Sequence, residues 1–406
     1  GRCIKKPTLI KPTTTTKPTT TTKPTLIKKP TLIKKPTTTT KPTTTTKKNN
    51  KKQINKNKVI RNDLLKDLRQ RKNEINCNIF SNSKSQLKFL GAGVANRVYL
   101  SCVTESCKRK VALRLMTIDN YIKFDNNHPN KVEMRAYEVF NGLLERNITQ
   151  HIPYKITNFK CKINDLINTN IRRNARGFEY NYYTGEIKDD IDILVTEYCK
   201  FGHARGYLNK NMYKMNDLDL KIFIFQLMSG IVTLQYHIPH FKHNDMHSEN
   251  ILVGSYNLKT KKGVNKYIKY ILFEQEFYIP LREFCVKIYD FDTIYGEGFA
   301  NAKLEDSIYT QIGVTNKDNP VFDYHLSLNS LFKLEHFSSQ KETIKFYEEQ
   351  VPEEYRGNSN QFISYARLTN YKTNYFSNNT NLIPSNIQTP SDVLLNHPYF
   401  DVLRTK

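Results

Sequence analysis

Apolar residues recur at helical spacing in two long stretches of the chain. Residues 217–237 place them along one broad face: Leu218, Ile222, Phe225, Leu227, Met228, Ile231 and Leu234. Residues 131–145 show a second such face: Val132, Ala136, Tyr137, Val139, Phe140, Leu143 and Leu144. Because residues three and four positions apart lie on the same side of an α-helix, each stretch is predicted to be a helix packed on a core.

Shorter apolar and β-branched runs predict strands at residues 87–90, 98–103, 110–116 and 193–199. Gly91 and Gly93 lie between the first two strands, where glycine lets the backbone come close to a phosphate. An ordinary hairpin turn that contains glycine, with no role in phosphate binding, would have the same sequence pattern. The polar residues 164–190 are predicted to be an insertion between strands, and residues 254–284 a hairpin insertion.

Residues 59–75 show a weaker helical pattern among charged residues: Val59, Ile60, Leu64, Leu65, Leu68 and Ile75. We expect an amphipathic helix here, followed by a linker to residue 84. Packing on the domain that follows is the simpler role for this helix, and binding to a partner protein is the alternative.

The first 58 residues differ in composition from the rest. Residues 11–46 are six hexads, four of the form Lys-Pro-Thr-Thr-Thr-Thr and two of the form Lys-Pro-Thr-Leu-Ile-Lys. A proline in every hexad favours extended geometry and the segment has little to bury, so a disordered low-complexity spacer is predicted. Attachment to nucleic acid or to an anionic surface, and modification of the threonines, are the functional alternatives.

The positive charge is concentrated in this tail. The whole chain has 406 residues and a formal net charge of +25. Residues 1–60 contain 17 Lys and Arg and no Asp or Glu, so the other 346 residues carry 46 minus 38 charges, or +8. A basic surface that could attract nucleic acid is therefore expected from the tail alone.

Cysteine usage and hydropathy suggest an intracellular protein. The seven cysteines are odd in number and follow no framework of close pairs, so reduced thiols are expected in place of disulfides. Cys102 and Cys107 could pair or share a metal ion, but no second close pair accompanies them, so two thiols on a hairpin are the preferred interpretation. No apolar run approaches the roughly 20 residues of a membrane span, and no secretory signal pattern is found. The chain opens on Gly1, which is compatible with a fragment or a processed protein.

Residues 243–250 carry the candidate chemistry, with the sequence His-Asn-Asp-Met-His-Ser-Glu-Asn. Asp245 and Asn250 are five residues apart, behind His243 and ahead of an apolar run at 251–253. A carboxylate can take the proton of an attacking hydroxyl, and an amide oxygen can help to hold a metal ion against nucleotide phosphates. This stretch is therefore a candidate site of phosphoryl transfer.

This stretch resembles the catalytic loop of the protein-kinase superfamily, His-x-Asp-x-x-x-x-Asn. Three further stretches in the family's order support the resemblance: residues 286–292, which contain Asp290-Phe291-Asp292; residues 90–99, which contain Gly91-Ala92-Gly93; and residues 111–114, which end in Arg114. The resemblance runs from about residue 85 to residue 403, most similar to divergent Ser/Thr kinases of large DNA viruses. It implies host-cell cytoplasm or the virion as the location.

The resemblance implies an α+β, bilobal fold after the disordered tail. The small β-rich N-lobe would comprise residues 85–199 and the larger helical C-lobe residues 200–406. Residues 321–325 resemble the start of the helix whose Asp, here Asp323, steadies the catalytic loop. Residues 390–400 resemble the last helix of the large lobe.

The resemblance also implies ATP and Mg²⁺ as cofactors, a protein substrate and a role for each site residue. Asp245 would be the catalytic base, and Asn250 and Asp290 the metal ligands. Six residues would bind ATP: Leu90, Gly91, Gly93, Val98, Arg114 and Glu133. Among them, Arg114 would contact the phosphates and Glu133, with Glu138 as the alternate, would be its acidic partner.

Several residues depart from the family pattern. Arg114 replaces the phosphate-binding Lys, Asn244 the Arg that pairs with a phosphorylated activation loop, and Asp292 the usual Gly. His247 stands in place of Lys, as in aminoglycoside and choline phosphotransferases and in divergent viral kinases, and no Ala-Pro-Glu end to the activation segment is found. Two alternatives to an active protein kinase follow: an inactive pseudokinase that binds nucleotide or a partner, and a phosphotransferase that acts on small molecules.

Overall fold

The computed structural model describes residues 75–80, 87–93, 96–102, 110–118, 125–167, 184–256, 267–305, 314–316, 318–334, 340–351, 356 and 388–405. All of them belong to one compact unit, Ile60–Lys406. The repeat tail, and the helix predicted at 59–75 apart from its last residue, lie outside the described residues. The described part is an α+β structure, as the fold class predicted.

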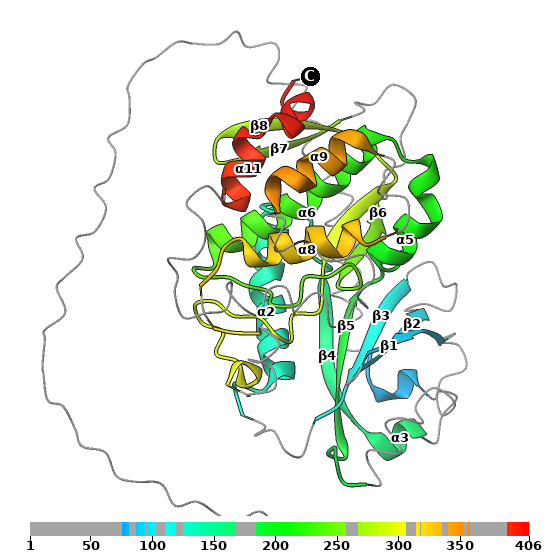
Figure 1. Cartoon of the computed structure of the whole chain (residues 1–406). Coiled ribbons are helices and arrows are strands. Elements are labelled where there is room, and N and C mark those ends of the chain that lie inside the picture. The colour runs from blue at the N-terminus through cyan, green and yellow to red at the C-terminus, as the bar shows by residue number, and fades with distance from the viewer. Residues whose placement is uncertain are drawn as a thin grey trace, which may run out of the picture. The chain divides into compact units, whose positions relative to one another are not determined.

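The N-terminal half of the described chain forms a five-stranded antiparallel sheet, with strand order β1-β2-β3-β5-β4 (Figure 1). The strands are β1 (Lys88–Ala92), β2 (Asn96–Cys102), β3 (Lys110–Met116), β4 (Lys155–Lys162) and β5 (Asp190–Glu197). Helix α2 (Pro129–Glu145) separates β3 from β4 in the sequence, and the short helix α3 (Ile163–Ile167) follows β4. Sequence patterns predicted four of these strands and α2 but missed β4.

Strand β3 places Arg114 in the middle of the sheet. Arg114 lies opposite Val98 on β2 and opposite Leu194 on β5. Its neighbours Leu113 and Leu115 are fully buried in the apolar core. Because successive side chains of a strand point to opposite faces, Arg114 lies on the other face from these two leucines.

The C-terminal half of the described chain is mainly helical. Its helices are α5 (Ala204–Asn211), α6 (Asp217–His237), α8 (Phe322–Phe332), α9 (Lys341–Gln350) and α11 (Pro390–Asn396). Short 3-10 helices lie at η5 (Met212–Lys214), η6 (Ala302–Leu304) and η10 (Pro398–Leu403). Two antiparallel ribbons accompany the helices: β6 (Ile251–Ser255) with β9 (Phe284–Ile288), and β7 (Tyr267–Leu272) with β8 (Gln275–Pro280). The second ribbon is the hairpin predicted within residues 254–284.

Helix α6 has the bounds that the sequence predicted, and its N-terminus explains where it begins. Asn216 accepts a hydrogen bond from the Asp219 amide, and Asp219 accepts one from the Asn216 amide, which forms a capping box. Further along, Gly230 allows close packing, because an added Cβ would lie 2.9 Å from Cδ1 of Ile288 on β9. The helix before residues 243–250 therefore packs tightly against the strand before Asp290.

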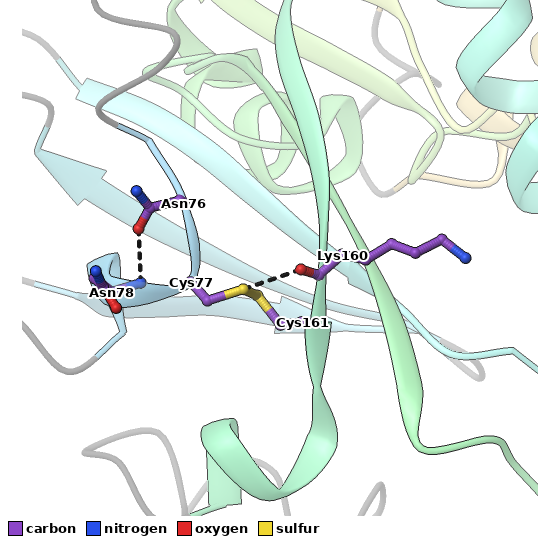
Figure 2. Close-up of a disulfide and its surroundings, with 5 residues drawn as sticks. All are labelled: Asn76, Cys77, Asn78, Lys160 and Cys161. Carbon is purple, nitrogen blue, oxygen red and sulfur yellow. Dashed lines mark hydrogen bonds between the residues drawn. A yellow bond between two sulfur atoms is a disulfide. The ribbon is translucent and has the colours of Figure 1, made fainter.

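A disulfide contradicts the expectation of reduced thiols. Cys77, in the 3-10 helix η2 (Cys77–Ile79), is bonded to Cys161 on β4, as Figure 2 shows. Cys102 is also disulfide-bonded, so its interpretation as a free thiol was wrong, whereas Cys199 and Cys285 are free and buried. The two bonded cysteines in Figure 2 are 84 residues apart in the sequence but have Cα atoms only 5.7 Å apart. Spacing along a chain does not reveal such a proximity.

No helix in the described ranges is long and apolar enough to cross a membrane.

Candidate active site

The pairing of β6 with β9 brings residues 243–250, the candidate catalytic loop, next to the Asp290 turn. Ile251 lies opposite Ile288 in the ribbon, so the residues that flank the pair, Asn250 and Tyr289, are neighbours. The amide of Tyr289 donates to the carbonyl oxygen of Asn250 at 3.1 Å. Two segments 40 residues apart thus meet at the edge of a short ribbon whose inward residues are fully buried.

Asp323 on α8 anchors the start of the catalytic loop. Its carboxylate accepts the amide of His243 at 2.5 Å and the amide of Asn244 at 2.9 Å. Asp323 is fully buried, and burial raises the pKa of its carboxyl group while the contacts with His243 oppose that shift. The carboxylate fixes the loop backbone two residues before Asp245.

His243 joins the catalytic loop to the segment after β9. Its ring is fully buried, and Nε2 lies 3.1 Å from the carbonyl oxygen of Tyr289. Since a carbonyl oxygen can only accept, Nε2 carries the proton and donates. The ring also packs on Phe291, with centroids 5.2 Å apart. His243 therefore has a buried, structural position.

Asn250 and His247 surround the carboxylate of Asp245. Nδ2 of Asn250 donates to Oδ2 of Asp245 at 2.8 Å and to its backbone carbonyl at 2.9 Å. Nε2 of His247 lies 3.4 Å from the same Oδ2. The Asp245 side chain remains partly exposed, in contrast to the buried anchors of the loop. The amide of Asn250 thus orients the carboxylate that would face an acceptor hydroxyl.

Arg114 joins two carboxylates in a buried cluster. Its Nη1 donates to Oε1 of Glu133 at 2.6 Å, which is the partner that the sequence predicted, and its Nη2 donates to Oδ1 of Asp290. The alternate, Glu138, instead pairs with Lys155 at 3.1 Å. Glu133 is fully buried and Arg114 is 4% exposed. The sheet, helix α2 and the turn after β9 meet at this guanidinium.

The charges in this cluster depend on one another. Burial by itself would lower the pKa of Arg114, but the carboxylates of Asp290 and Glu133 raise it well above its ordinary value. Burial raises the pKa of Glu133 and of Asp290, and the Arg114 guanidinium opposes both shifts. The Arg114 guanidinium consequently stays charged, and its positive charge stabilises the ionised form of each carboxylate.

The turn after β9 is held from two sides. The amide of Phe291 donates to Oε1 of Glu133 at 3.3 Å, and the ring of Tyr289 lies under the Arg114 guanidinium, 5.4 Å away. Asp290 itself has a φ of 73°, a left-handed conformation that is uncommon for a residue other than glycine. Glu133 therefore ties Arg114 and the Asp290 turn together.

Asp292, the departure that the sequence left open, is paired with a lysine that sequence reasoning missed. Its carboxylate accepts from Nζ of Lys303 on η6 at 2.5 Å, and its carbonyl oxygen accepts from Nδ2 of Asn301 at 2.9 Å. The extra carboxylate is thereby neutralised within the turn. No local sequence signal marks Lys303 as its partner, since the two residues lie 11 positions apart in the sequence.

The other predicted nucleotide-binding residues lie on the neighbouring strands β1 and β2. Leu90 and Gly91 belong to β1, and Val98 on β2 is paired directly with Arg114. Gly93 lies in the turn between the two strands, where an added Cβ would lie 2.8 Å from Oδ1 of Asn96 and would have to displace that side chain. Residues 94 and 95, at the turn itself, are outside the described residues.

The described residues contain no group of three or more His, Cys, Asp or Glu side chains arranged to hold a metal ion. Of the two predicted ligands, Asp290 uses one carboxylate oxygen on Arg114, and Asn250 uses its amide nitrogen on Asp245. Within the described residues, no hydrogen bond is found to the second carboxylate oxygen of Asp290 or to the amide oxygen of Asn250. An amide oxygen and a carboxylate oxygen are hard ligands of the kind that Mg²⁺ prefers, so the pair fits this ion in its chemistry.

Comparison with known proteins supports the kinase resemblance at a distance. No protein-family model matches the chain. Over 69% of its length it is 26% identical to a protein of Acanthamoeba polyphaga mimivirus named "Putative serine/threonine-protein kinase". A second protein of that virus with the same descriptive name is 23% identical over 61% of the chain. A serine/threonine-protein kinase of Candida albicans is 22% identical over 41%.

These matches cover different shares of the relatives. The chain spans 60% of the length of the first mimivirus protein, 70% of the second and 13% of the Candida kinase. All three of these relatives carry the name of a serine/threonine-protein kinase. The chain is a divergent, kinase-like protein of the type found in large DNA viruses.

Proposed function

We propose that this chain is an ATP-dependent phosphotransferase with a bilobal, protein-kinase-like fold, and that it phosphorylates serine or threonine residues of proteins. The observation that carries the proposal is the meeting of Asp245, Asn250 and Asp290 through the β6–β9 ribbon, with the loop backbone held by Asp323. The names of the mimivirus relatives support the choice of a protein acceptor.

In the proposed reaction, the acceptor hydroxyl oxygen forms a bond to the γ-phosphorus of ATP. The bond from that phosphorus to the β–γ bridging oxygen breaks, ADP leaves with the electron pair, and the hydroxyl proton passes to Asp245. Asn250 orients the Asp245 carboxylate through its 2.8 Å hydrogen bond. Bound Mg²⁺, held by the amide oxygen of Asn250 and the second oxygen of Asp290, would neutralise phosphate charge.

Arg114 would contact the phosphates from β3, with Glu133 holding its side chain. Its guanidinium already bonds two carboxylates, and one of them belongs to the proposed metal ligand Asp290. This contact favours a second candidate function, a pseudokinase that binds nucleotide but transfers phosphate slowly or not at all. Arg and Lys are not equivalent at such a site, because the planar fork reaches two partners at once.

The decisive experiment compares the intact chain with Asp245→Asn. We would measure transfer of labelled γ-phosphate from ATP to the chain itself, to generic protein substrates and to hydroxylated metabolites. Loss of a catalytic base should lower the rate about 10²- to 10⁴-fold. Asp318→Asn is the matched control, because this exposed aspartate pairs with His240 at the surface, and it should keep the wild-type rate.

Each outcome separates the candidate functions. Equal transfer by the wild type and Asp245→Asn would refute the assigned base. No transfer by the wild type, together with a rise in its melting temperature on adding nucleotide, would favour the pseudokinase. Transfer to metabolites but not to proteins would favour the small-molecule phosphotransferase that His247 suggested.

A further inference from the structure

The candidate catalytic loop, residues 243–250, ends in a tight turn. The amide of Asn250 donates to the carbonyl oxygen of His247 at 2.8 Å, so the last four residues of the loop form a β-turn. Ser248, the second residue of this turn, is only 3% exposed. Its carbonyl oxygen accepts the amide of Arg205, at the start of α5, at 3.2 Å. Ser248 is therefore buried in the turn that leads into the proposed metal ligand Asn250, and α5 holds its carbonyl group.

Helix α8 holds the amide group of the same residue. The amide of Ser248 donates to Oγ of Ser330 at 2.8 Å, and the Ser330 hydroxyl donates to Oγ of Ser248 at 3.0 Å. Ser330 is 7% exposed, so the contact is shielded from water. A buried amide that lacks an acceptor lowers stability, because it has lost its hydrogen bond to water without a replacement. The Ser330 hydroxyl is thus the acceptor that allows the Ser248 amide to be buried.

The same face of α8 holds the loop at two places. Asp323 accepts the first two amides of the loop, and Ser330 accepts the amide of Ser248. Seven residues are almost two turns of an α-helix, so positions 323 and 330 lie on one face, about 10 Å apart along the axis. Asp245 lies between the two held points in the sequence, and Asn250 follows the second. One rigid helix therefore spans the proposed base and the proposed metal ligand.

We infer that Ser330 is a positioning residue that fixes the turn before Asn250, in addition to the contacts of Asp323 with the start of the loop. Nδ2 of Asn250 donates to the carbonyl oxygen and to Oδ2 of Asp245. A shift of the turn would therefore displace the proposed metal ligand and the carboxylate that it orients. Ser330 acts through the backbone of Ser248, so it is not itself a catalytic residue. The inference rests on the proposed function, because it states how the phosphotransferase site is kept in place.

The first test compares two serines of α8. Ser330→Ala removes the acceptor of the Ser248 amide. Ser327→Ala is the matched control, because Ser327 is a fully buried serine of the same helix whose hydroxyl donates to the carbonyl oxygen of Tyr324 at 2.8 Å. We expect Ser330→Ala to lower kcat for a protein substrate about 10- to 100-fold, and Ser327→Ala to stay within about two-fold of the wild type. The KM for ATP should change less than kcat, because most of the proposed ATP contacts lie on β1, β2 and β3.

Amide hydrogen exchange gives a readout that does not depend on transfer. The Ser248 amide should exchange about ten-fold or more faster in Ser330→Ala than in the wild type, because its acceptor is lost, and at the wild-type rate in Ser327→Ala. Ser330→Thr keeps a hydroxyl at the same carbon, so it should protect the Ser248 amide and transfer phosphate faster than Ser330→Ala. The three variants therefore separate the loss of the acceptor from a general loosening of α8.

Three results would overturn the inference. The first is an equal kcat for Ser330→Ala and Ser327→Ala, and the second is an unchanged exchange rate of the Ser248 amide in Ser330→Ala. The third is a Ser330→Thr protein that protects this amide but is as slow as Ser330→Ala, because the hydroxyl would then not set the rate. If even the wild type transfers no phosphate while the exchange pattern is as expected, the proposed function fails but the hold of Ser330 on the turn stands.

Discussion

Two parts of the candidate site are held in place by different interactions. The cluster of Arg114, Glu133 and Asp290 contains one buried cation between a fully buried carboxylate, Glu133, and a partly buried one, Asp290. The start of the catalytic loop is held mainly by hydrogen bonds from its backbone amides to a single carboxylate, Asp323, and from the neutral amide of Asn244. The Arg114 cluster therefore depends on the balance between positive and negative charge. The start of the loop depends on how many of its backbone amides have a hydrogen-bond acceptor.

This difference predicts different tolerance to substitution. Removing one member of a buried ion pair leaves a charge without its partner in a medium where it is poorly solvated, so the cost is large. Removing one acceptor from a hydrogen-bonded backbone leaves an unsatisfied amide, which costs less. The Arg114 cluster should therefore be the more fragile of the two, although both lie at the same site.

Glu133→Gln should have the largest effect. It deprives the Arg114 guanidinium of a charged partner 2.6 Å away and should lower the free energy of unfolding by about 3–5 kcal/mol. Urea denaturation would measure this loss. Glu138→Gln is the control on the same helix, because Glu138 is 69% exposed and its partner Lys155 also donates to the carbonyl oxygen of Met134, so this pair should contribute less than about 1 kcal/mol. Equal losses in the two variants would contradict the ionic account of the cluster.

Asp323→Asn tests the hydrogen-bonded side. The amide oxygen can accept from only one of the two backbone amides of His243 and Asn244 in the present geometry, which leaves the other unsatisfied. We expect a loss of about 1–3 kcal/mol in the free energy of unfolding. The same denaturation measurement applies. A loss greater than that of Glu133→Gln would reverse the comparison.

Arg114→Lys keeps the positive charge but removes the fork. A lysine ammonium is a point charge, so we expect it to keep the ion pair with Glu133 and to lose the contact with Asp290. This change should lower the free energy of unfolding by about 1–2 kcal/mol. The released carboxylate should strengthen nucleotide binding in Mg²⁺ relative to EDTA. Calorimetric titration of both proteins with ATP would measure that ratio. An unchanged ratio would show that the Asp290 contact does not compete with the metal.

Acid should weaken the N-terminus of helix α2, the helix that carries Glu133. Burial, with nearby lysines, lowers the pKa of His128 from 6.5 to about 4, and Nδ1 of this histidine caps α2 by accepting the Asn130 amide. The unfolded chain binds this proton below pH 6.5 while the native chain does not. His128 therefore costs stability as pH falls from 6.5 towards 4, by up to about 1.4 kcal/mol per pH unit.

His128→Asn isolates this contribution, because asparagine is a good N-cap residue that does not titrate. Its unfolding free energy should depend less steeply on pH between 6.5 and 4. The part of the slope due to His325, a buried histidine on α8 whose pKa burial lowers to about 3, should remain. If the variant and the wild type show the same slope, His128 is not neutral in the native protein at these pH values.

Much of the local structure could be predicted from the sequence. The apolar face of residues 217–237 and the polar residues around it determine helix α6, because helix formation depends on neighbours three and four positions apart. The order of the short motifs indicated the kinase-like arrangement. Strand β4 was missed because a bulge between Lys155 and Thr157 interrupts the alternation of apolar and polar residues by which a strand is found.

The tertiary structure largely decided which side chains of the site contact one another. The sequence identified Asp245, Asn250, Arg114 and Glu133 as candidates, but the contact between Arg114 and Asp290 joins residues 176 positions apart. The same holds for Asn244 with Thr315 and for Cys77 with Cys161. Periodicity and short motifs report on a few neighbouring residues, whereas a buried charge or amide takes whichever partner the packed elements bring within about 3 Å.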